Sequence, residues 1–286
     1  MGIPCVNFFC DHVREFRKLP DEFGAFNNNW VPEYKAVKLY TDAGYPFINL
    51  PMPMWVEPKY RVLREEANRQ ITFIGSKDMQ RILLLERLAK QEPAIPLAIY
   101  GAGWNDSDNG AQPSEIPPDY TLKKKIKFNK DFIRNQGIAP FIRKIKYRKM
   151  TFGTPALLNA KTHCSPTFET YNELIAGSMI SLGINRYESF HYPIYKPNSY
   201  SRLRDIEAPM LGACYLTEYT EGLEELYDLD NEIMAYLDAE DLYMKIKQLQ
   251  ADPAKRKSLK MHGQKKALGK HNIPSSLNII LQRVIH

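Results

Sequence analysis

Residues 71–104 read ITFIGSKDMQRILLLERLAKQEPAIPLAIYGAGW and contain a strand, a helix and a second strand in succession. Ile71–Ile74 and Leu97–Tyr100 are short apolar runs, and each is followed directly by a glycine. Between them, Asp78–Gln91 carries apolar residues at helical spacing and opens with aspartate, a residue type that caps helix N-termini. This strand–helix–strand order is typical of a parallel sheet covered by helices.

The same alternation continues toward the C-terminus. Apolar runs predict three further strands, at Met179–Asn185, Ala213–Thr217 and Glu232–Tyr236. Helical spacing predicts helices at Thr170–Gly177, Ser201–Leu211, Asp238–Gln250, Pro253–Leu268 and Ser275–Ile285. We therefore expect an α/β fold with a Rossmann-like, doubly wound parallel sheet.

Residues 1–60 follow a different pattern. Pro4–Cys10 predicts a short buried strand, and Trp30–Tyr40 predicts a short helix after an asparagine-rich turn. Tyr45–Val56 is extended and contains three prolines, which a central strand does not tolerate. We interpret this last stretch as a linker between a partial N-terminal α/β segment and the larger sheet.

Composition excludes several classes of protein. Of the 286 residues, 44% are hydrophobic and 25% are charged, as in ordinary globular proteins. The longest nearly apolar run, Leu174–Ile184, is shorter than the ~20 residues of a membrane span, and the N-terminus lacks the order of a signal peptide. Four cysteines without a Cys-x-x-Cys pair indicate neither a zinc site nor a disulfide framework. These features predict a reduced, cytoplasmic protein.

Positive charge is concentrated in one insert between Leu122 and Met150. The insert has many lysines and arginines and a single acidic residue, Asp131. Because its positive charge exceeds the net charge of +6, the rest of the chain is mildly acidic. The basic residues are Lys123, Lys124, Lys125, Lys127, Lys130, Arg134, Arg143, Lys144, Lys146, Arg148 and Lys149. We therefore infer no nucleic-acid partner from the charge of the whole chain.

The insert also carries apolar residues at helical spacing among its cations, at Leu122, Ile126 and Ile133 and again at Phe141, Ile142 and Ile145. A basic amphipathic helix is typical of a segment that lies on a membrane surface. We expect residues 122–150 to contact the inner face of a membrane peripherally. A solvated helical hairpin packed on the domain is the alternative.

Common catalytic patterns are missing from the sequence. The chain has no Walker A loop, no His-Glu-x-x-His and no Gly-x-Ser-x-Gly. The neighbours His163 and Cys164 rarely form a catalytic pair in space, because catalytic partners usually come from separate segments. Gly101-Ala102-Gly103 follows a strand, but the third glycine position of a dinucleotide fingerprint holds Asp106, which disfavours a nicotinamide dehydrogenase.

Two segments combine residues suited to binding a nucleotide. Gly75 follows the first strand, and Lys77 and Arg81 flank the start of the next helix. A glycine and two cations at a helix N-terminus suit the binding of a diphosphate. The alternative is that Lys77 and Arg81 are simply solvated. Glu207 lies on a helix that runs directly into the next strand, so it would face the crevice beyond the strand ends. There it would accept hydrogen bonds from ribose hydroxyls, or else pair with Arg204 one turn away.

Five stretches in this order resemble the C-terminal half of a glycosyltransferase of the GT-B fold. Within that fold they resemble the spore-maturation CgeB-like group, which is related to the group 1 or family 4 enzymes. The resemblance covers about residues 64–273. The stretches are ITFIGSKDMQRILLLERL (71–88), PLAIYGAGW (96–104), MISLGIN (179–185), SRLRDIEAPMLGACYLTEYTEGLEELY (201–227) and EIMAYLDAEDLYMKIKQLQADPAKR (232–256).

The resemblance implies three parts in the chain. Residues 1–63 would be the C-terminal remnant of the acceptor-side domain, and residues 64–273 the nucleotide-sugar-binding domain with its insert at 122–150. Residues 274–286 would form a C-terminal helix. Because a GT-B enzyme binds its acceptor mostly through its first domain, we expect the chain to bind a donor and to transfer its sugar slowly.

The resemblance also implies roles for individual residues. Glu207 matches the second glutamate of the family 4 Glu-x7-Glu pattern, which holds the donor ribose, whereas the first glutamate is absent. Arg81 matches a lysine that contacts the diphosphate, and Ser76 stands where an arginine is expected. We therefore expect Arg81 and Glu207 to be catalytic, and the donor site to comprise Gly75, Ser76, Lys77, Gly101, Gly103, Ser201, Arg204, Glu207 and Thr217.

The activity implied is transfer of a sugar from a nucleotide-diphosphate sugar to a glycan, lipid or protein acceptor, without a metal ion or cofactor. Cations and helix amides would stabilise the departing diphosphate. The expected partners are a nucleotide sugar and a saccharide or lipid-linked acceptor. The alternative is a non-catalytic nucleotide- or partner-binding module derived from a glycosyltransferase.

Overall fold

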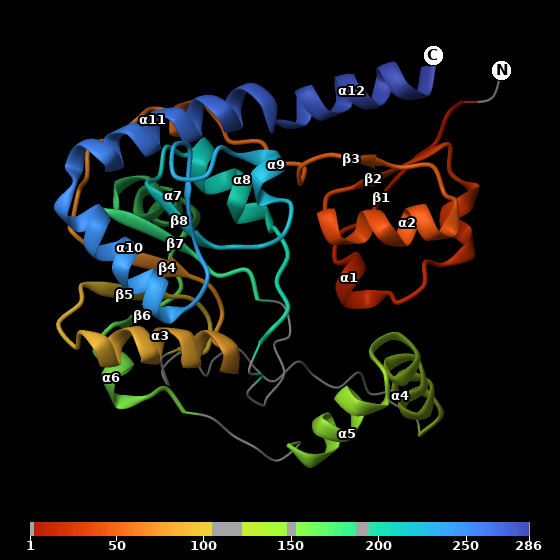
Figure 1. The fold of residues 1–286 in the computed structure, drawn as a ribbon, viewed down its shortest axis with the longest axis horizontal. Helices are drawn as coiled ribbons and strands as arrows, with labels where there is room; N and C mark the ends of the chain where they lie inside the picture. The colour runs from red at the N-terminus through yellow and green to blue at the C-terminus, as the bar shows by residue number, and fades with distance from the viewer. Residues whose placement is uncertain (1–2, 105–121, 148–152, 187–193, 195, 286) are drawn as a thin grey trace.

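The computed structural model describes residues 3–104, 122–147, 153–186, 194 and 196–285 (Figure 1). Two parallel sheets lie toward opposite ends of the longest axis of the molecule. We call the part built on the smaller, N-terminal sheet the first body, and the part built on the larger sheet the second body.

The first body is a three-stranded parallel sheet in the order β1-β2-β3. Its core surrounds Tyr40, which is fully buried and hydrogen-bonded through its hydroxyl to Nε2 of His12 at 2.7 Å. The strands are β1 (Val6–Phe8), β2 (Asn28–Val31) and β3 (Ile48–Asn49), with helices α1 (His12–Glu15) and α2 (Val37–Ala43) and single turns η1 (Asp21–Ala25) and η2 (Tyr34–Ala36).

The second body is a six-stranded parallel sheet in the order β6-β5-β4-β7-β8-β9. The strands are β4 (Ile71–Ile74), β5 (Leu97–Tyr100), β6 (Thr162–His163), β7 (Ile180–Gly183), β8 (Tyr215–Glu218) and β9 (Met234–Tyr236). The helices around it are α3 (Met79–Gln91), α6 (Ala156–Asn159), α7 (Phe168–Gly177), α8 (Leu203–Met210), α9 (Leu223–Leu226), α10 (Ala239–Ala251) and α11 (Pro253–Lys270).

Helices cover both faces of this sheet. On one face, Phe73 and Leu216 belong to a core that includes Leu85 of α3 and Ile246 of α10. On the other face, Tyr215 belongs to a core that includes side chains of α7, α8 and α9. Neighbouring residues of β4 and β8 thus point to opposite cores, as the period of a strand requires. The expected α/β fold with a doubly wound, Rossmann-like sheet is confirmed.

Most of the expected elements of the second body are present, with ends that move by a few residues. Asp78 caps α3 as predicted, because its Oδ1 accepts a hydrogen bond from the backbone amide of Arg81 at 2.9 Å. The strand β6 was not predicted, since Thr162 and His163 lie at the sheet edge and are not a run of apolar residues. Position in the fold, rather than local pattern, makes them a strand.

Two expectations for residues 1–60 are wrong, and β1, which was expected to be buried, has no fully buried residue. Trp30 and Val31 belong to the buried strand β2 rather than to a helix, and α2 begins only at Val37. The polar residue Asn29 makes this segment look like a turn in the sequence. Inside the first body, however, its side-chain amide donates hydrogen bonds to the carbonyls of Phe23 and Pro46. The stretch interpreted as a linker also contributes the third strand, β3.

The C-terminal helix α12 (Ile273–Ile285) packs against the first body (Figure 1). Ile280 is 6% exposed and lies in a cluster with Trp30 and Leu50. Because α12 follows α11 of the second body almost without a break, the end of the chain fastens one body to the other.

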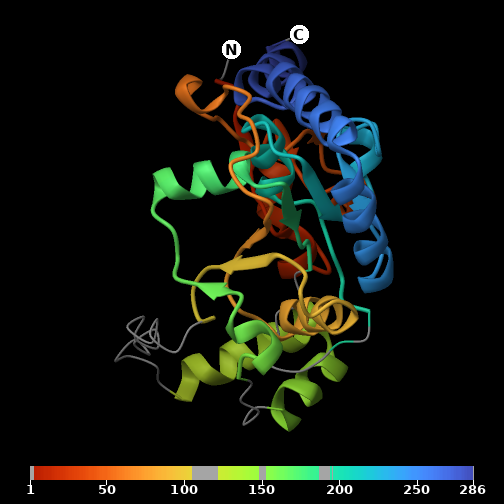
Figure 2. The same cartoon turned by 90° about the vertical axis from the view of Figure 1, so that its left-hand side faces the viewer.

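The basic insert forms a helical hairpin at the edge of the molecule opposite α12 (Figures 1 and 2). Its helices are α4 (Leu122–Gln136) and α5 (Ile138–Lys146), and α4 contacts α1 of the first body. Residues 148–150 of the insert, like Asp106, lie outside the described residues. None of the described helices combines the length and the apolar character that crossing a bilayer requires.

The packing of α12 gives a test of how the bodies are held together. Replacing Ile280 by alanine should lower the free energy of unfolding by about 2–4 kcal/mol, because it leaves a cavity between Trp30 and Leu50. Urea unfolding followed by circular dichroism measures this loss. The neighbour Ile279, 44% exposed, is the control, and its replacement by alanine should cost under about 1 kcal/mol. Equal losses would contradict the packing described.

Candidate functional site

A cavity of about 520 Å³ lies at the carboxyl ends of β4 and β7, facing the first body. From β4 the chain proceeds outward to β5, and from β7 it proceeds in the opposite direction to β8, so the cavity marks the switch point where ligands of open α/β sheets bind. Its lining comprises Cys10, Asp11, Met52, Phe73, Ile74, Gly75, Ser76, Arg81, Tyr171, Gly183, Ile184, Asn185, Tyr200, Arg202, Leu203, Arg204, Glu207 and Tyr215.

Three arginines converge on this cavity, Arg81 from α3 and Arg202 and Arg204 from the start of α8. The pKa of Arg81 is lowered chiefly by burial; Asp78 opposes this effect, and the positive charges of Arg202 and Arg204 add to it. Two carboxylates, Asp11 and Glu207, share the lining, so its formal charge is positive. An anion bound among the guanidinium groups would relieve their mutual repulsion.

Hydrogen bonds hold two of these guanidinium groups at the end of β4. Arg81 donates through Nη1 to the backbone carbonyl of Ser76 at 2.6 Å and to its hydroxyl at 3.0 Å, and its Nε lies 3.0 Å from a carboxylate oxygen of Asp78. Arg204 donates to the backbone carbonyl of Ile74. Arg204 thus lies at the end of the strand that Ser76 follows, where the resemblance leaves a missing cation.

Arg202 is a cavity residue that the sequence analysis did not single out. It precedes α8, donates through Nη2 to the carbonyl of Arg186 at 3.1 Å, and lies 4.9 Å from the ring centre of Tyr200. Its Nε is buried and has no hydrogen-bond partner among the described residues. A buried donor without a partner is costly, so this group is suited to an acceptor that a ligand supplies.

Glu207 lies half-buried on α8 and lines the cavity. Its Oε2 accepts a hydrogen bond from the hydroxyl of Tyr171, whose pKa is raised by burial and by this carboxylate. The alternative of a surface pair with Arg204 does not describe the site, because Arg204 is directed to Ile74 and the Tyr171 ring.

The buried carboxylate of Asp205 stabilises the start of α8 through hydrogen bonds. Asp205 has no exposed surface and accepts hydrogen bonds from the hydroxyl of Tyr215 at 2.8 Å, the hydroxyl of Thr217 at 3.0 Å and the amide of Asn185 at 3.0 Å. It also accepts from the backbone amide of Arg202 at 3.0 Å. Asp205 therefore joins the cationic turn to the ends of β7 and β8.

The opposite wall comes from the first body. Asp11 follows β1, and its backbone is in the left-handed region, with φ 68°, which is uncommon for a residue other than glycine and frequent at functional sites. The Tyr200 hydroxyl donates to Asp11 Oδ1. This contact joins the two bodies across the cavity. Sequence analysis missed Asp11, although an aspartate directly after an apolar strand is the available signal.

Three predicted site residues, Lys77, Gly101 and Gly103, do not line the cavity. Gly101 has φ 130°, and a side chain there would collide with the backbone of Gly75. The backbone amides of Gly75 and Lys77 donate to the carbonyls of Tyr100 and Ala102 at 2.8 and 2.9 Å, so neither amide is available to a phosphate. Gly101, Gly103 and the half-buried Lys77 therefore shape the loop without lining the cavity.

Two further predicted residues are also absent from the lining. Thr217 is fully buried and donates to Asp205, so it supports α8 and does not reach a ligand in this arrangement. Ser201 lines a separate hollow of about 320 Å³ on the side of α12. The predicted residues that the structure does bring together are Gly75, Ser76, Arg81, Arg204 and Glu207.

No metal site is evident in the described part of the chain, where no group of three or more His, Cys, Asp or Glu side chains could hold an ion. The sequence contains Asp-x-Asp at 106–108 and at 228–230. The first lies outside the described residues, and Asp228 of the second borders a different hollow, away from the cavity.

Solved structures share the fold of this chain at low sequence identity. They include a TarM mutant from S. aureus in complex with UDP (13% identity, TM-score 0.56), sucrose-phosphate synthase from Thermosynechococcus elongatus (13%, 0.54) and HepE from Anabaena in complex with UDP-glucose (11%, 0.54). The alignments cover 92%, 92% and 90% of this chain, and 45%, 59% and 63% of theirs, so this chain spans less than two thirds of each. The fold is that of the GT-B glycosyltransferases.

Sequence comparison then gives the family. The model of the glycosyl transferase-like family matches residues 80–282, and the chain belongs to this family. A comparison with curated proteins found no match.

The hydrogen bonds of Asp205 can be tested by mutation. Asp205→Ala should lower the free energy of unfolding by about 3–5 kcal/mol, because it leaves the hydroxyls of Tyr215 and Thr217 buried without their acceptor and removes one acceptor of the Asn185 amide. Urea unfolding is the measurement.

Glu207→Ala, on the same helix, is the matched control. Its carboxylate is half-buried and accepts from Tyr171, so its loss should cost about 1 kcal/mol or less. If Asp205→Ala were no more destabilising than Glu207→Ala, Asp205 would not hold the cationic turn in place.

Proposed function

We propose that the cavity is the donor site of a glycosyltransferase that uses a nucleotide-diphosphate sugar. The observation that carries this proposal is the convergence of Arg81, Arg202 and Arg204 with Glu207 at the switch point of the sheet. Planar guanidinium groups suit the oxygens of a diphosphate, and a carboxylate suits the two hydroxyls of a ribose. The UDP-glucose in HepE and the UDP in TarM, two proteins of this fold, support the assignment.

The chemistry of transfer fits this arrangement. The bond between the anomeric carbon of the sugar and the β-phosphate oxygen breaks, and its electron pair leaves with the diphosphate. An acceptor hydroxyl forms the new bond and gives up its proton. The three arginines stabilise the charge that develops on the leaving group, so we propose that transfer proceeds without a metal ion or cofactor.

Asp11 is positioned to take the acceptor's proton. It is the acidic side chain that the first body contributes to the lining, and it faces the arginines from the opposite wall. The Tyr200 hydroxyl donates to Oδ1 and holds the carboxylate in place, which leaves Oδ2 for the acceptor. We assign the acceptor, whether a glycan, a lipid or a protein, to this side of the cavity.

A second candidate is a nucleotide-binding module without turnover. Among the described residues, only Cys10, Asp11 and Met52 reach the lining from the part of the chain that precedes β4, so the acceptor side of the wall is small. Both candidates bind the donor, and only the glycosyltransferase breaks it down. Release of UDP from UDP-glucose separates them.

Donor binding gives the first test. Glu207→Ala should weaken both uridine and UDP by about ten- to a hundredfold, because the ribose is common to both ligands. Arg81→Ala should weaken UDP far more than uridine, because its guanidinium faces the diphosphate. Isothermal titration calorimetry measures each affinity.

The control is Glu240→Ala, which removes an exposed glutamate of α10 outside the lining and should leave both affinities unchanged. Unchanged UDP affinity in folded Glu207→Ala and Arg81→Ala would show that the nucleotide binds elsewhere.

The role of Asp11 gives a separate test. Asp11→Asn should slow hydrolysis of UDP-glucose, in which water replaces the acceptor, by about a hundredfold or more, because a general base is lost. UDP affinity should stay within about twofold, since Asp11 does not contact the donor nucleotide. A parallel loss of UDP affinity would instead make Asp11 a structural link to Tyr200.

A further inference from the structure

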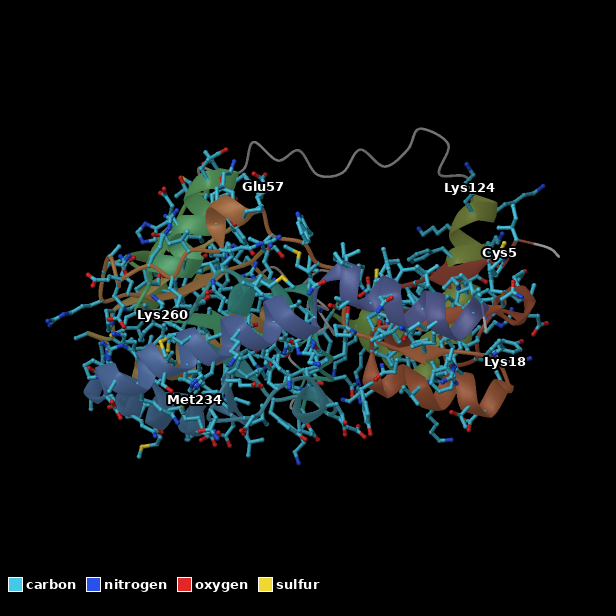
Figure 3. The ribbon with its side chains drawn as sticks, turned by 90° about the horizontal axis from the view of Figure 1, so that it is seen from above. Cys5, Lys18, Glu57, Lys124, Met234 and Lys260 are labelled. Carbon is cyan, nitrogen blue, oxygen red and sulfur yellow. The ribbon has the colours of Figure 1, made fainter. Side chains whose placement is uncertain are left out.

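The hairpin of α4 and α5 has a strongly basic surface. Its described residues, 122–147, contain nine lysines and arginines and one acid, Asp131. Figure 3 shows Lys124 of α4 on the side of the molecule that holds Cys5 and Lys18 of the first body, away from Lys260 of α11. The charge therefore forms a local patch on one end of an otherwise mildly acidic protein.

Both helices also expose large apolar side chains. On α5, Ile138, Ile142 and Ile145 follow the spacing of one helix face and are 65%, 58% and 57% exposed. On α4, Leu122 and Ile126, one turn apart, are 73% and 58% exposed. Such a concentration of exposed apolar surface marks a contact site.

These isoleucines are not the core of the hairpin. The inner contact is made by Phe132 and Phe141, whose ring centres lie 6.3 Å apart. The Lys144 ammonium lies 4.4 Å from the ring centre of Phe132 and 4.5 Å from that of Phe128, and burial there lowers its pKa. The aromatic rings thus join the helices and leave the isoleucines on the outside.

We propose that α4 and α5 form a docking surface for an anionic membrane. The exposed Lys123, Lys125 and Lys127 attract negatively charged groups, and the exposed isoleucines favour an apolar phase close to those groups. The boundary between lipid headgroups and acyl chains provides both. A nucleic-acid backbone offers the phosphates but no apolar phase for the isoleucines, so a membrane fits the surface better.

The position of the hairpin connects this surface to the cavity. The helix α4 contacts α1, whose first residue, His12, directly follows Asp11. Docking would therefore bring the membrane to the side of the first body that forms the acceptor wall. This favours an acceptor carried by a lipid, an inference that rests on the proposed function, whereas membrane docking itself does not.

Vesicle co-sedimentation of the full chain tests the docking. We expect binding to phosphatidylcholine vesicles that contain 30% phosphatidylglycerol, weakening as salt is raised, and no binding to pure phosphatidylcholine. Ile138→Ser/Ile142→Ser/Ile145→Ser should weaken binding at least tenfold without changing the charge. Lys123→Gln/Lys125→Gln/Lys127→Gln should weaken it about a hundredfold, because each lysine near an anionic surface contributes about fivefold.

Matched controls keep the outcome specific. Leu237→Ser/Met244→Ser/Leu281→Ser removes three exposed apolar side chains from elsewhere, and Lys257→Gln/Lys265→Gln/Lys270→Gln removes three exposed lysines of α11. Both should bind vesicles like the unaltered chain, and circular dichroism should show every variant folded. Absence of binding to anionic vesicles at low salt, or binding unaffected by the isoleucine variant, would overturn the proposal. Tight binding to single-stranded RNA that the isoleucine variant retains would assign the surface to nucleic acid instead.

Discussion

The site depends on one buried carboxylate. Asp205 accepts hydrogen bonds from two hydroxyls and a side-chain amide at the ends of β7 and β8, and from the backbone amide of Arg202 in its own turn. A carboxylate so completely hydrogen-bonded is stable without solvent, and each of its partners is satisfied in return. Because Arg202, Arg204 and Glu207 surround Asp205 in sequence, fixing Asp205 to the strand ends fixes the side chains that line the cavity.

The site also depends on the contact between the two bodies, which meet at the cavity. The second body supplies the arginines and Glu207, and the first supplies Asp11 through its contact with Tyr200. On the far side, α12 packs Ile280 against Trp30 and so resists separation of the bodies. Two separate contacts thus join the bodies, one at the cavity and one at α12. A site shared in this way suits a reaction between two substrates held by different walls.

Sequence reasoning succeeded where local pattern and fold agree. The apolar run Ile71–Ile74 and the capped helix that follows are visible in the sequence, and Arg81 and Glu207 then lie near strand ends. It failed where long-range contacts decide. Asn29 makes β2 look like a turn, because its partners Phe23 and Pro46 are known only from the fold. Asp11 and Arg202 were missed because their importance depends on Tyr200, which brings the first body to the cavity.

The central proposal is that the arginine turn held by Asp205 binds a diphosphate while Glu207 binds the attached ribose. A crystal structure of the chain with UDP bound tests it most directly. The account predicts phosphate oxygens within hydrogen-bond distance of Arg81, Arg202 and Arg204, with the ribose hydroxyls on Glu207. Density for UDP outside this cavity, or a diphosphate that touches none of the three arginines, would contradict it.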